Sequence, residues 1–361
     1  MDADAFAYWL RGPGSGEIRA ERLPAPGPDD VLVRTLHTGV SRASESLVFR
    51  GGVPASQYAA MRAPFQDGDF PGPLKYGYLN VGVVEQGPAA LLGQTVFCLF
   101  PHQSAYVVPA AAVHVVPDGV PARRAVLAGT VETAVNALWD AAPLVGDRIA
   151  VVGAGMVGCC TARLLGQIPG VEVTMFDVDP TKAAVAAALG VGFAMAGDAV
   201  DAGPAAGVGD GNDIGAACDL VFHTSGTSAG LQLALELLAP EGEVIDLSWY
   251  GNAPVTLALG GNFHSARLAI RSSQVGAVAP ARRRNRTTGQ RLELALELLR
   301  DPAFDALLTG ASPFAQLPQV MQQLADRQLP ALCHTITYAE VSADGESRPA
   351  EYRPAESRKA G

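Results

Sequence analysis

Apolar residues in the first third of the chain fall in short runs that turn residues separate. Such runs at 17–19, 31–35, 81–85 and 95–99 predict strands. Prolines and a glycine between residues 24 and 28 interrupt the pattern before the second run. Short strands broken by proline and glycine predict a compact, barrel-like β-rich domain.

The pattern changes near residue 128, where apolar segments of strand and helix length begin to alternate. The predicted strands lie at 148–152, 171–176, 220–222 and 243–247, and the predicted helices at 125–142, 156–167, 181–189 and 229–238. Parallel strands need long crossovers, usually helices, so this alternation predicts an α/β domain with a parallel sheet. A helix at 291–299 and a strand at 331–338 follow.

Two further segments lack such periodicity. Residues 197–217 are rich in Gly, Ala and Asp and are predicted to form a flexible surface loop. Residues 342–361 are polar and contain two prolines, which predicts a disordered tail.

A glycine fingerprint joins the first strand and helix of the alternating part. Gly153, Gly155 and Gly158, with Met156 and Val157 between them, follow an apolar strand and open a helix. In such a loop the glycines allow a tight turn, close approach to a pyrophosphate and close helix–strand packing. The helix N-terminus adds free N–H groups and a partial positive charge. This context predicts a nicotinamide dinucleotide site; the alternative is a glycine-rich turn without a ligand.

An acidic residue ends the next predicted strand, 24 residues after the first glycine of the fingerprint. Asp177 is placed to accept hydrogen bonds from the adenine-ribose hydroxyls, and its charge would repel a 2′-phosphate. Val178 follows where an NADP site often has arginine. The sequence therefore predicts NAD rather than NADP. Lys182 is either a ribose contact or a solvated helix residue.

Charge and composition narrow the choice of partners. The 361 residues carry a formal net charge of −10, which argues against a nucleic-acid partner because such a partner needs a basic face. No apolar run approaches the length of a membrane span, and the acidic N-terminus lacks the features of a signal peptide, so a cytoplasmic location is expected. The five cysteines form no C-x-x-C pair and are expected to be reduced and buried.

The order of these parts resembles the medium-chain dehydrogenase/reductase superfamily, which contains zinc-type alcohol dehydrogenases and quinone reductases. Residues 26–33 are similar to the family's opening strand, and residues 77–84 stand where the family has its Gly-His-Glu run. Residues 133–138 lie one helix before the glycine fingerprint, and 224–226 resemble the loop along the cofactor. The resemblance extends to about residue 338.

The resemblance implies a two-domain architecture. A GroES-like β-rich catalytic domain would comprise 1–128 and 273–340, a doubly wound Rossmann domain 129–272, and a tail 341–361. Side chains and backbone expected along the cofactor are Thr133, Thr224, Ser225, Gly226 and Ser248.

The chain departs from the family at the positions that bind catalytic zinc. Where family members have Cys, His and Glu, this chain has Ser41, Tyr78 and Leu79, and the remaining ligand position falls at about Gly129. The four-cysteine lobe that binds structural zinc is missing. Zinc needs three or four N, S or O ligands in tetrahedral geometry, so we predict that this chain binds no zinc.

Other groups must then polarise a carbonyl and move a proton. The hydroxyl and the His of the family's proton relay fall at about Ala43 and Ser46 in this chain. Tyr78 is expected in the cleft, either as a hydrogen-bond donor to a developing alkoxide or as an aromatic filling the place of the metal. The further candidates are Ser41, Arg42 as an oxyanion or acidic-substrate ligand, Glu45 and Glu132 for proton exchange, and His264 as an acid or base near the nicotinamide. A surface turn also explains Arg42 and Glu45, and an ordinary loop position also explains His264 and His102.

Three functions fit these features. The first is a zinc-independent, NAD-dependent oxidoreductase acting on a secondary alcohol or ketone; the second is a zinc-free enoyl or quinone reductase. The third is a catalytically silent dinucleotide sensor. Within the superfamily the chain most resembles zinc-lacking bacteriochlorophyllide-type dehydrogenases, but too few motifs are shared to transfer their substrate. A small-molecule substrate is expected, and apolar residues 255–259 suggest an edge strand for a homodimer. The basic run at 282–286 is either a solvated loop or a site for an acidic ligand.

Overall fold

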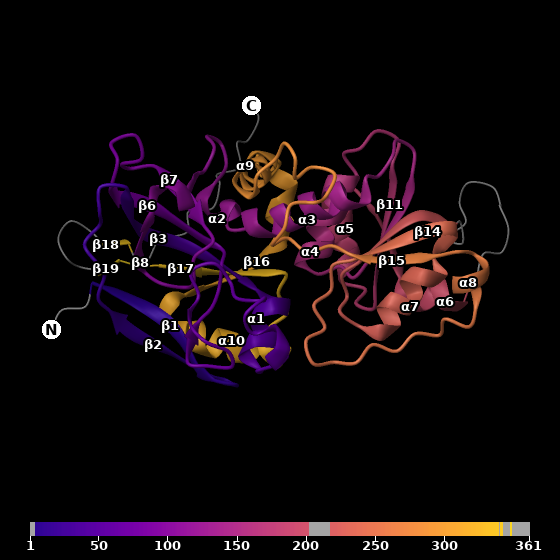
Figure 1. Cartoon of the computed structure of the whole chain (residues 1–361), viewed down its shortest axis with the longest axis horizontal. Helices are drawn as coiled ribbons and strands as arrows, with labels where there is room; N and C mark the ends of the chain where they lie inside the picture. Colours follow the sequence, from indigo (N-terminus) through magenta and orange to yellow (C-terminus); the bar gives the residue numbers. More distant parts are fainter. Residues whose placement is uncertain (1–3, 202–216, 339, 342–346, 349–361) are drawn as a thin grey trace, which may run out of the picture.

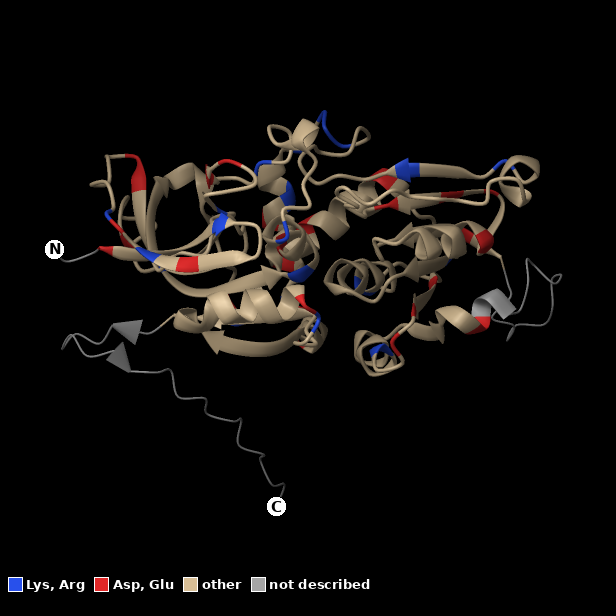
Figure 2. Cartoon of the chain, turned by 90° about the horizontal axis from the view of Figure 1, so that it is seen from below, with Lys and Arg blue, Asp and Glu red and all other residues tan. Residues whose placement is uncertain are grey.

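A computed structural model describes residues 4–201, 217–338, 340–341 and 347–348, and the chain forms two parts (Figure 1). A β-rich half lies on the left of Figure 1, and a sheet flanked by helices lies on the right. Charged residues of both signs are interspersed over both parts (Figure 2).

Two sheets build the β-rich half. Among the described strands the smaller sheet has the order β2-β1-β5-β4, and the larger has the order β16-β17-β3-β6-β7-β9, with β8 also paired to β3. The strands are β1 (Ala5–Gly12), β2 (Ser15–Glu21), β3 (Asp30–Ser41), β4 (Asp67–Gly68), β5 (Leu74–Lys75), β6 (Asn80–Gln86), β7 (Thr95–Cys98), β8 (Ala105–Pro109), β9 (His114–Val115), β16 (Leu308–Pro313) and β17 (Cys333–Thr337). Because β17 pairs with β3, segments from near both ends of the chain belong to the same sheet of this half.

Four helices accompany these sheets in the described residues: α1 (Arg42–Phe49), α2 (Ala122–Ala125), α9 (Thr288–Leu298) and α10 (Leu317–Ala325). Helix α1 begins directly at the end of β3, so the turn between them is held at the centre of the larger sheet. Helix α9 begins with a capping box, in which Thr287 and Gln290 bond reciprocally to each other's backbone N–H.

The second part is a parallel sheet with the order β12-β11-β10-β13-β14-β15 among the described strands. The strand order reverses between β10 and β13, which is the switch point at which doubly wound sheets bind dinucleotides. The elements are α3 (Ala128–Ala141), β10 (Arg148–Val152), α4 (Met156–Leu165), β11 (Glu172–Asp177), α5 (Lys182–Leu189), β12 (Gly192–Met195), α6 (Ala196–Asp201), β13 (Cys218–His223), α7 (Ser228–Glu236), β14 (Leu238–Asp246), α8 (Asn262–Ser265) and β15 (Ala269–Ser272).

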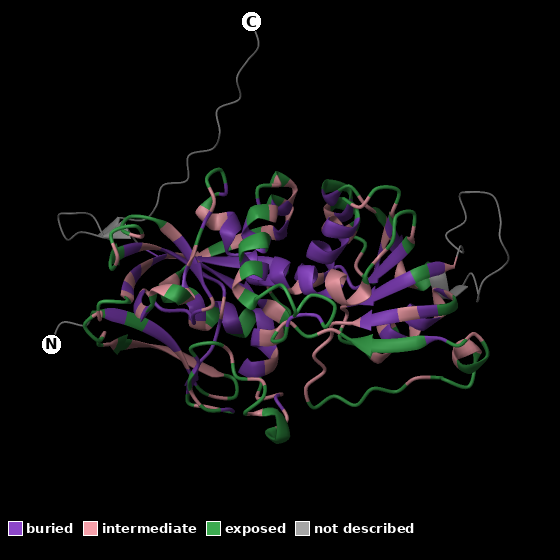
Figure 3. Ribbon diagram, turned by 45° about the horizontal axis from the view of Figure 1, so that its top comes forward, coloured by how far each residue is buried: buried purple, intermediate pink, exposed green. Residues whose placement is uncertain are grey.

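Alternate side chains of this sheet enter two separate cores. Ile149 and Val151 pack with residues of α3, α4 and α9, whereas Ala150 and Val152 pack with residues of α7. This period of two follows from the pleat of a strand, and apolar residues on both faces require helices on both sides. The central strands are accordingly buried (Figure 3).

The predicted elements of the alternating part agree with the structure in type and order, with shifts at their ends. Two predictions need correction. Helix α6 extends into the segment predicted as a loop, of which residues 202–216 lie outside the described residues. Residues 255–259 form no strand; the edge strand is β15.

Residues 255–259 lie along helix α7, which explains why they form no strand. The backbone N–H groups of Thr256 and Ala258 donate to side chains of α7, Ser228 at 3.1 Å and Gln232 at 2.8 Å. Leu257 packs against the core beneath that helix. The apolar run therefore covers α7 instead of extending the sheet.

The five cysteines are buried and free, as the sequence predicted. In the described residues no helix has both the length and the apolar character needed to cross a membrane. Strand β18 (Glu340–Val341), where the predicted tail begins, pairs with β19 (Ser347–Arg348) inside it, and the remainder of the tail lies outside the described residues.

Candidate active site

The glycine fingerprint forms a tight connection between β10 and α4. Gly153 has φ +107°, a conformation that L side chains rarely adopt. A Cβ on Gly158 would lie 1.9 Å from the carbonyl oxygen of Gly153, so only glycine lets α4 approach the strand this closely. Gly155 faces open space and caps α4 without any side-chain hydrogen bond. The loop thus presents an open helix N-terminus, which fits a pyrophosphate.

The acid at the end of β11 lies against this loop. One carboxylate oxygen of Asp177 accepts from the N–H of Ala154 at 2.7 Å, and the other accepts from the N–H of Asp179 at 2.9 Å. Lys182, the first residue of α5, forms an ion pair with Asp179 at 3.5 Å. Val178, between the two acids, is 79% exposed. Two carboxylates and an exposed apolar side chain therefore lie beside the glycine loop, where doubly wound folds place an adenosine.

One arginine from the β-rich half lies near these acids, and a second arginine lies near the first. Arg42, the first residue of α1, has its pKa lowered by burial and by the positive charge of Arg327, while Asp177 and Asp179 oppose that shift. Arg42 therefore lies within electrostatic reach of the carboxylates across the crevice. The sequence reasoning missed Arg327, because nothing local distinguishes an arginine that follows α10.

Thr224, Ser225, Gly226 and Ser248 follow β13 and β14 at the carboxyl edge of the sheet. The hydroxyl of Thr224 donates to the carbonyl of Gly153 at 2.7 Å, so this residue braces the glycine loop. The N–H of Gly226 donates to the hydroxyl of Ser248 at 3.1 Å, which joins the two loops. The structure thus brings these four predicted residues to the same edge as the glycine fingerprint.

A buried histidine beside these residues was not anticipated. His223 ends β13 and lies directly opposite Asp246, the last residue of β14. Its Nδ1 is 2.9 Å from Asp246, and its Nε2 is 2.7 Å from the hydroxyl of Ser225. The signal was available: two neighbouring parallel strands end in His and Asp, and parallel strand ends share one edge.

Tyr78 and Ser41 meet at the end of β3. The phenol of Tyr78 donates to the hydroxyl of Ser41 at 2.9 Å. Burial, followed by the negative charge of Glu45, raises the pKa of Tyr78, while hydrogen bonding with Ser41 and Ser44 opposes the shift. Tyr78 is therefore a phenol at neutral pH, able to donate but a weak base.

Glu45 holds the turn that carries Ser41, and it does not lie on a surface turn as one interpretation had it. It is 3% exposed, accepts from the N–H of Ser41 at 2.7 Å and lies 2.8 Å from Nε2 of the buried His102. The Nδ1 of His102 is 2.6 Å from the hydroxyl of Thr38. Both ring nitrogens of the buried His102 are therefore paired. The sequence did not indicate Glu45 as one of its partners, because Glu45 lies in the amphipathic first turn of α1.

Apolar packing fills the remaining positions of the family's zinc site. A Cβ on Gly129 would lie 2.7 Å from the side chain of Leu79, which is fully buried. The donor set around it consists of the hydroxyls of Ser41 and Tyr78, which already bond to each other. In the part of the chain that the structure describes, no three His, Cys, Asp or Glu residues gather as a metal site. These residues do not fit zinc, which prefers thiolate, imidazole and carboxylate ligands.

The two predicted site residues on helix α3, Glu132 and Thr133, form hydrogen bonds within the protein. Glu132 is buried and pairs with Arg291 of α9 at 3.0 Å, with its pKa raised by burial against the opposing charge of Arg291. The hydroxyl of Thr133 donates to the carbonyl of Gly129 within its own helix at 3.0 Å. Both side chains are thus engaged in structural hydrogen bonds.

His264 lies outside the candidate site. It is exposed on α8, just before β15, and therefore near the amino end of that strand. Figure 1 shows α8 at the outer end of the sheet, far from the β-rich half. Dinucleotides bind at the carboxyl ends of such strands.

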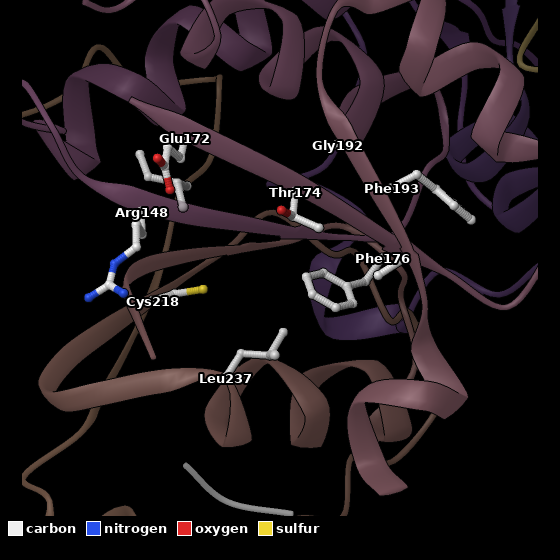
Figure 4. Close-up of a pocket in the computed structure, with 10 residues that line it drawn as sticks. Arg148, Glu172, Thr174, Phe176, Gly192, Phe193, Cys218 and Leu237 are labelled. Carbon is white, nitrogen blue, oxygen red and sulfur yellow. The ribbon is translucent and has the colours of Figure 1, made fainter. Parts of the chain in front are cut away.

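One cavity also lies away from the carboxyl edge. It has a volume of about 200 Å³, and its lining includes Arg148, Glu172 and Cys218, the first residues of β10, β11 and β13 (Figure 4). It is therefore near the amino ends of the strands and is not the dinucleotide site.

No protein-family model matches the chain. Solved structures do share its fold. The 2R,3R-butanediol dehydrogenase of Bacillus subtilis is 14% identical, with a TM-score of 0.70 over 92% of this chain and 99% of that chain. An Escherichia coli CFT073 alcohol dehydrogenase complexed with NADH is 16% identical, with a TM-score of 0.70 over 92% and 99% of the two chains.

The alcohol dehydrogenase of Thermus sp. ATN1 is 19% identical, with a TM-score of 0.68, over 92% of this chain and 99% of that chain. The chain therefore has the fold of the medium-chain dehydrogenases, a GroES-like domain combined with a Rossmann domain.

Proposed function

We propose that the chain is a nicotinamide-dependent oxidoreductase that transfers a hydride between the cofactor and a secondary alcohol or ketone, without zinc. The observation that carries this proposal is the hydrogen bond from Tyr78 to Ser41. Ser41 and Tyr78 stand at the sequence positions where the medium-chain dehydrogenases have zinc ligands, and Arg42 directly follows Ser41. Such a pair supplies donors where a metal would otherwise polarise a carbonyl.

The cofactor seat combines three kinds of group. The open N-terminus of α4 would face the pyrophosphate, with Arg42 and Arg327 adding positive charge from the opposite half. Asp177 would accept hydrogen bonds from the adenine ribose. Because Asp179 adds a second carboxylate there, we infer a preference for NAD over NADP. Bound NAD supplies the hydride acceptor or donor at its nicotinamide ring.

The hydroxyls of Tyr78 and Ser41 handle the proton. When a ketone is reduced, negative charge grows on its oxygen as the hydride arrives at carbon. Ser41 would donate to that oxygen and take a proton from the phenol of Tyr78 along their 2.9 Å hydrogen bond, and a proton from solvent would then restore Tyr78. Tyr78 carries its proton at neutral pH, as the reductive direction requires, and its raised pKa extends the protonated form to higher pH.

Replacing Tyr78 with phenylalanine tests this assignment. The change keeps the ring and removes the donor, so we expect kcat for NADH-dependent ketone reduction to fall about a hundredfold, the low end for general acid catalysis. Tyr76 offers a matched control, because its ring lies edge-on to that of Tyr78, with the ring centroids 6.0 Å apart. The Tyr76→Phe protein should retain most of its activity.

The remaining outcomes separate the alternatives. Reduction of enones but not ketones would favour the enoyl or quinone reductase. Binding of NADH without turnover of either substrate class would favour the sensor. One equivalent of zinc per chain by metal analysis would overturn the zinc-independent mechanism.

A further inference from the structure

Five side chains form a polar network at the carboxyl ends of β13 and β14: His223, Ser225, Asp246, Ser248 and Tyr250. Asp246 is its centre. One carboxylate oxygen lies 2.9 Å from Nδ1 of His223 and accepts from the N–H of Ser248 at 2.9 Å. The other accepts from the phenol of Tyr250 at 2.8 Å. The network therefore fixes a carboxylate in one orientation.

This carboxylate remains ionised. Burial alone would raise the pKa of Asp246, but hydrogen bonds from His223, Ser248 and Tyr250 outweigh it, and the pKa lies below its ordinary value. His223, the partner of this carboxylate, is fully buried. A second carboxylate, Asp140, lies close by, because Ser273 donates to Asp140 through its hydroxyl and to the Asp246 carbonyl through its N–H.

The network lies at the carboxyl edge of the sheet, on one side of the switch point. In a doubly wound sheet each half binds one mononucleotide, and the switch point here separates β10 from β13. The glycine loop and Asp177 belong to the half containing β10 to β12, the adenosine side. The nicotinamide side is then the half containing β13 to β15, where the network lies.

We propose that the Asp246 carboxylate, held by this network, stabilises the positively charged oxidised nicotinamide relative to the neutral reduced ring. The inference rests on the proposed function, since it requires a bound nicotinamide cofactor. A fixed negative charge in a partly dehydrated site favours a nearby cation and leaves a neutral ring almost unaffected. The bound couple then has a lower midpoint potential, by about 30 mV for each tenfold preference. Bound NADH becomes a stronger reductant.

The test measures dissociation constants of NAD⁺ and NADH by calorimetry for the whole chain and for Asp246→Asn. Asparagine keeps the size and an acceptor but removes the charge. We expect NAD⁺ to bind about tenfold more weakly and NADH to change less than twofold. Asp219→Asn is the matched control: it removes the same charge from the second residue of β13, at the opposite edge of the sheet. Its ratio of NAD⁺ to NADH dissociation constants should stay unchanged.

Each outcome decides one point. An unchanged ratio in Asp246→Asn, with both forms still bound, overturns the inference and leaves the oxidoreductase proposal standing. Failure of the wild-type chain to bind either form overturns the proposed function itself. If Asp246→Asn does not fold, wild-type affinities decide: NADH bound more than tenfold tighter than NAD⁺ contradicts the inference, and NAD⁺ bound at least as tightly as NADH supports it.

Discussion

Single carboxylates govern both ends of the candidate cofactor crevice. Asp177 is held by backbone N–H groups of the glycine loop and of Asp179, while Asp246 is held by His223 and Tyr250. We propose different roles for the two carboxylates because their surroundings differ: Asp177 would face the ribose, and Asp246 would face the ring whose charge changes during the reaction.

We expect Asp177→Asn to weaken the preference for NAD over NADP about tenfold. Asparagine retains an acceptor for Ala154 but no longer repels a 2′-phosphate. Dissociation constants of NADH and NADPH, measured by fluorescence, check this. Asp179→Asn removes a neighbouring charge that Lys182 partly compensates, so its effect should be smaller. An unaltered preference in Asp177→Asn would mean that another residue selects the cofactor.

The pH dependence of ketone reduction should reflect the raised pKa of Tyr78. A group whose pKa is raised keeps its proton to higher pH than usual, so the acid form persists through pH 10, where an ordinary tyrosine titrates. The rate of reduction should therefore stay level until above that pH, as long as the fold is intact. A decline with an apparent pKa near 7 would assign the proton to another group.

At the scale of elements, the position of the first turn of α4 depends on its close contact with the end of β10. The helix is anchored against β10 by Gly158 and against β13 by Thr224, whose hydroxyl reaches the Gly153 carbonyl. Tight packing between this helix and the strand places the helix N-terminus at the switch point. The same contact that stabilises the element thus builds the cofactor seat.

Gly158→Ala and Gly155→Ala should separate packing from binding. A Cβ at 158 meets the Gly153 backbone at 1.9 Å, so α4 must shift, and we expect a loss of about 1–3 kcal/mol of unfolding free energy. A Cβ at 155 meets no atom within 4 Å, so stability should hold while NADH binding weakens. Denaturant unfolding and NADH titration provide the two readouts. Equal stability losses would contradict this division.

At the scale of the molecule, α9 joins the two parts through one buried arginine. Arg291, 1% exposed, bonds to Glu132 and Asn136 of α3 and to the carbonyls of Val275 and Ala277. These carbonyls belong to the segment that follows β15. Arg291 therefore fixes the chain where it passes from β15 back to the β-rich half.

Arg291→Met should destabilise the fold by about 3–5 kcal/mol, because Glu132 then remains as a buried, unpaired charge. Adding Glu132→Gln should restore part of that loss. Arg300→Met is the surface control, since Arg300 pairs with the exposed Glu297, and it should change little. Urea unfolding measures all three proteins. A loss below 1 kcal/mol for Arg291→Met would show that the pair does not hold the halves together.

The exposed edge strand β15 supports the proposal of a homodimer through paired sheets. Its four residues are all exposed, and β14 occupies one edge only. We expect light scattering to give twice the chain mass, and Ile270→Lys to shift the mass toward that of one chain. A monomeric wild-type chain would exclude this assembly.

Local sequence predicted much of the site because short-range rules govern it. The strand Arg148–Val152, the glycine loop and the acid at 177 lie within one β–α–β unit, where backbone geometry demands glycine and leaves few alternatives. The prediction that Ser41, Tyr78 and Leu79 stand at the zinc-ligand positions rests on the family resemblance and on the chemistry of these residues, and it stays a prediction.

Contacts between distant residues were decided only by the tertiary structure. The partner of Glu132 is 159 positions away and that of Glu45 is 57 away, so neither pairing leaves a local pattern. The apolar run at 255–259 fitted an edge strand equally well until α7 supplied its hydrogen-bond partners. Sequence thus determined the residues that need a special backbone or special chemistry. The fold decided which buried charges neutralise each other, because burial makes pairing obligatory but does not specify the partner.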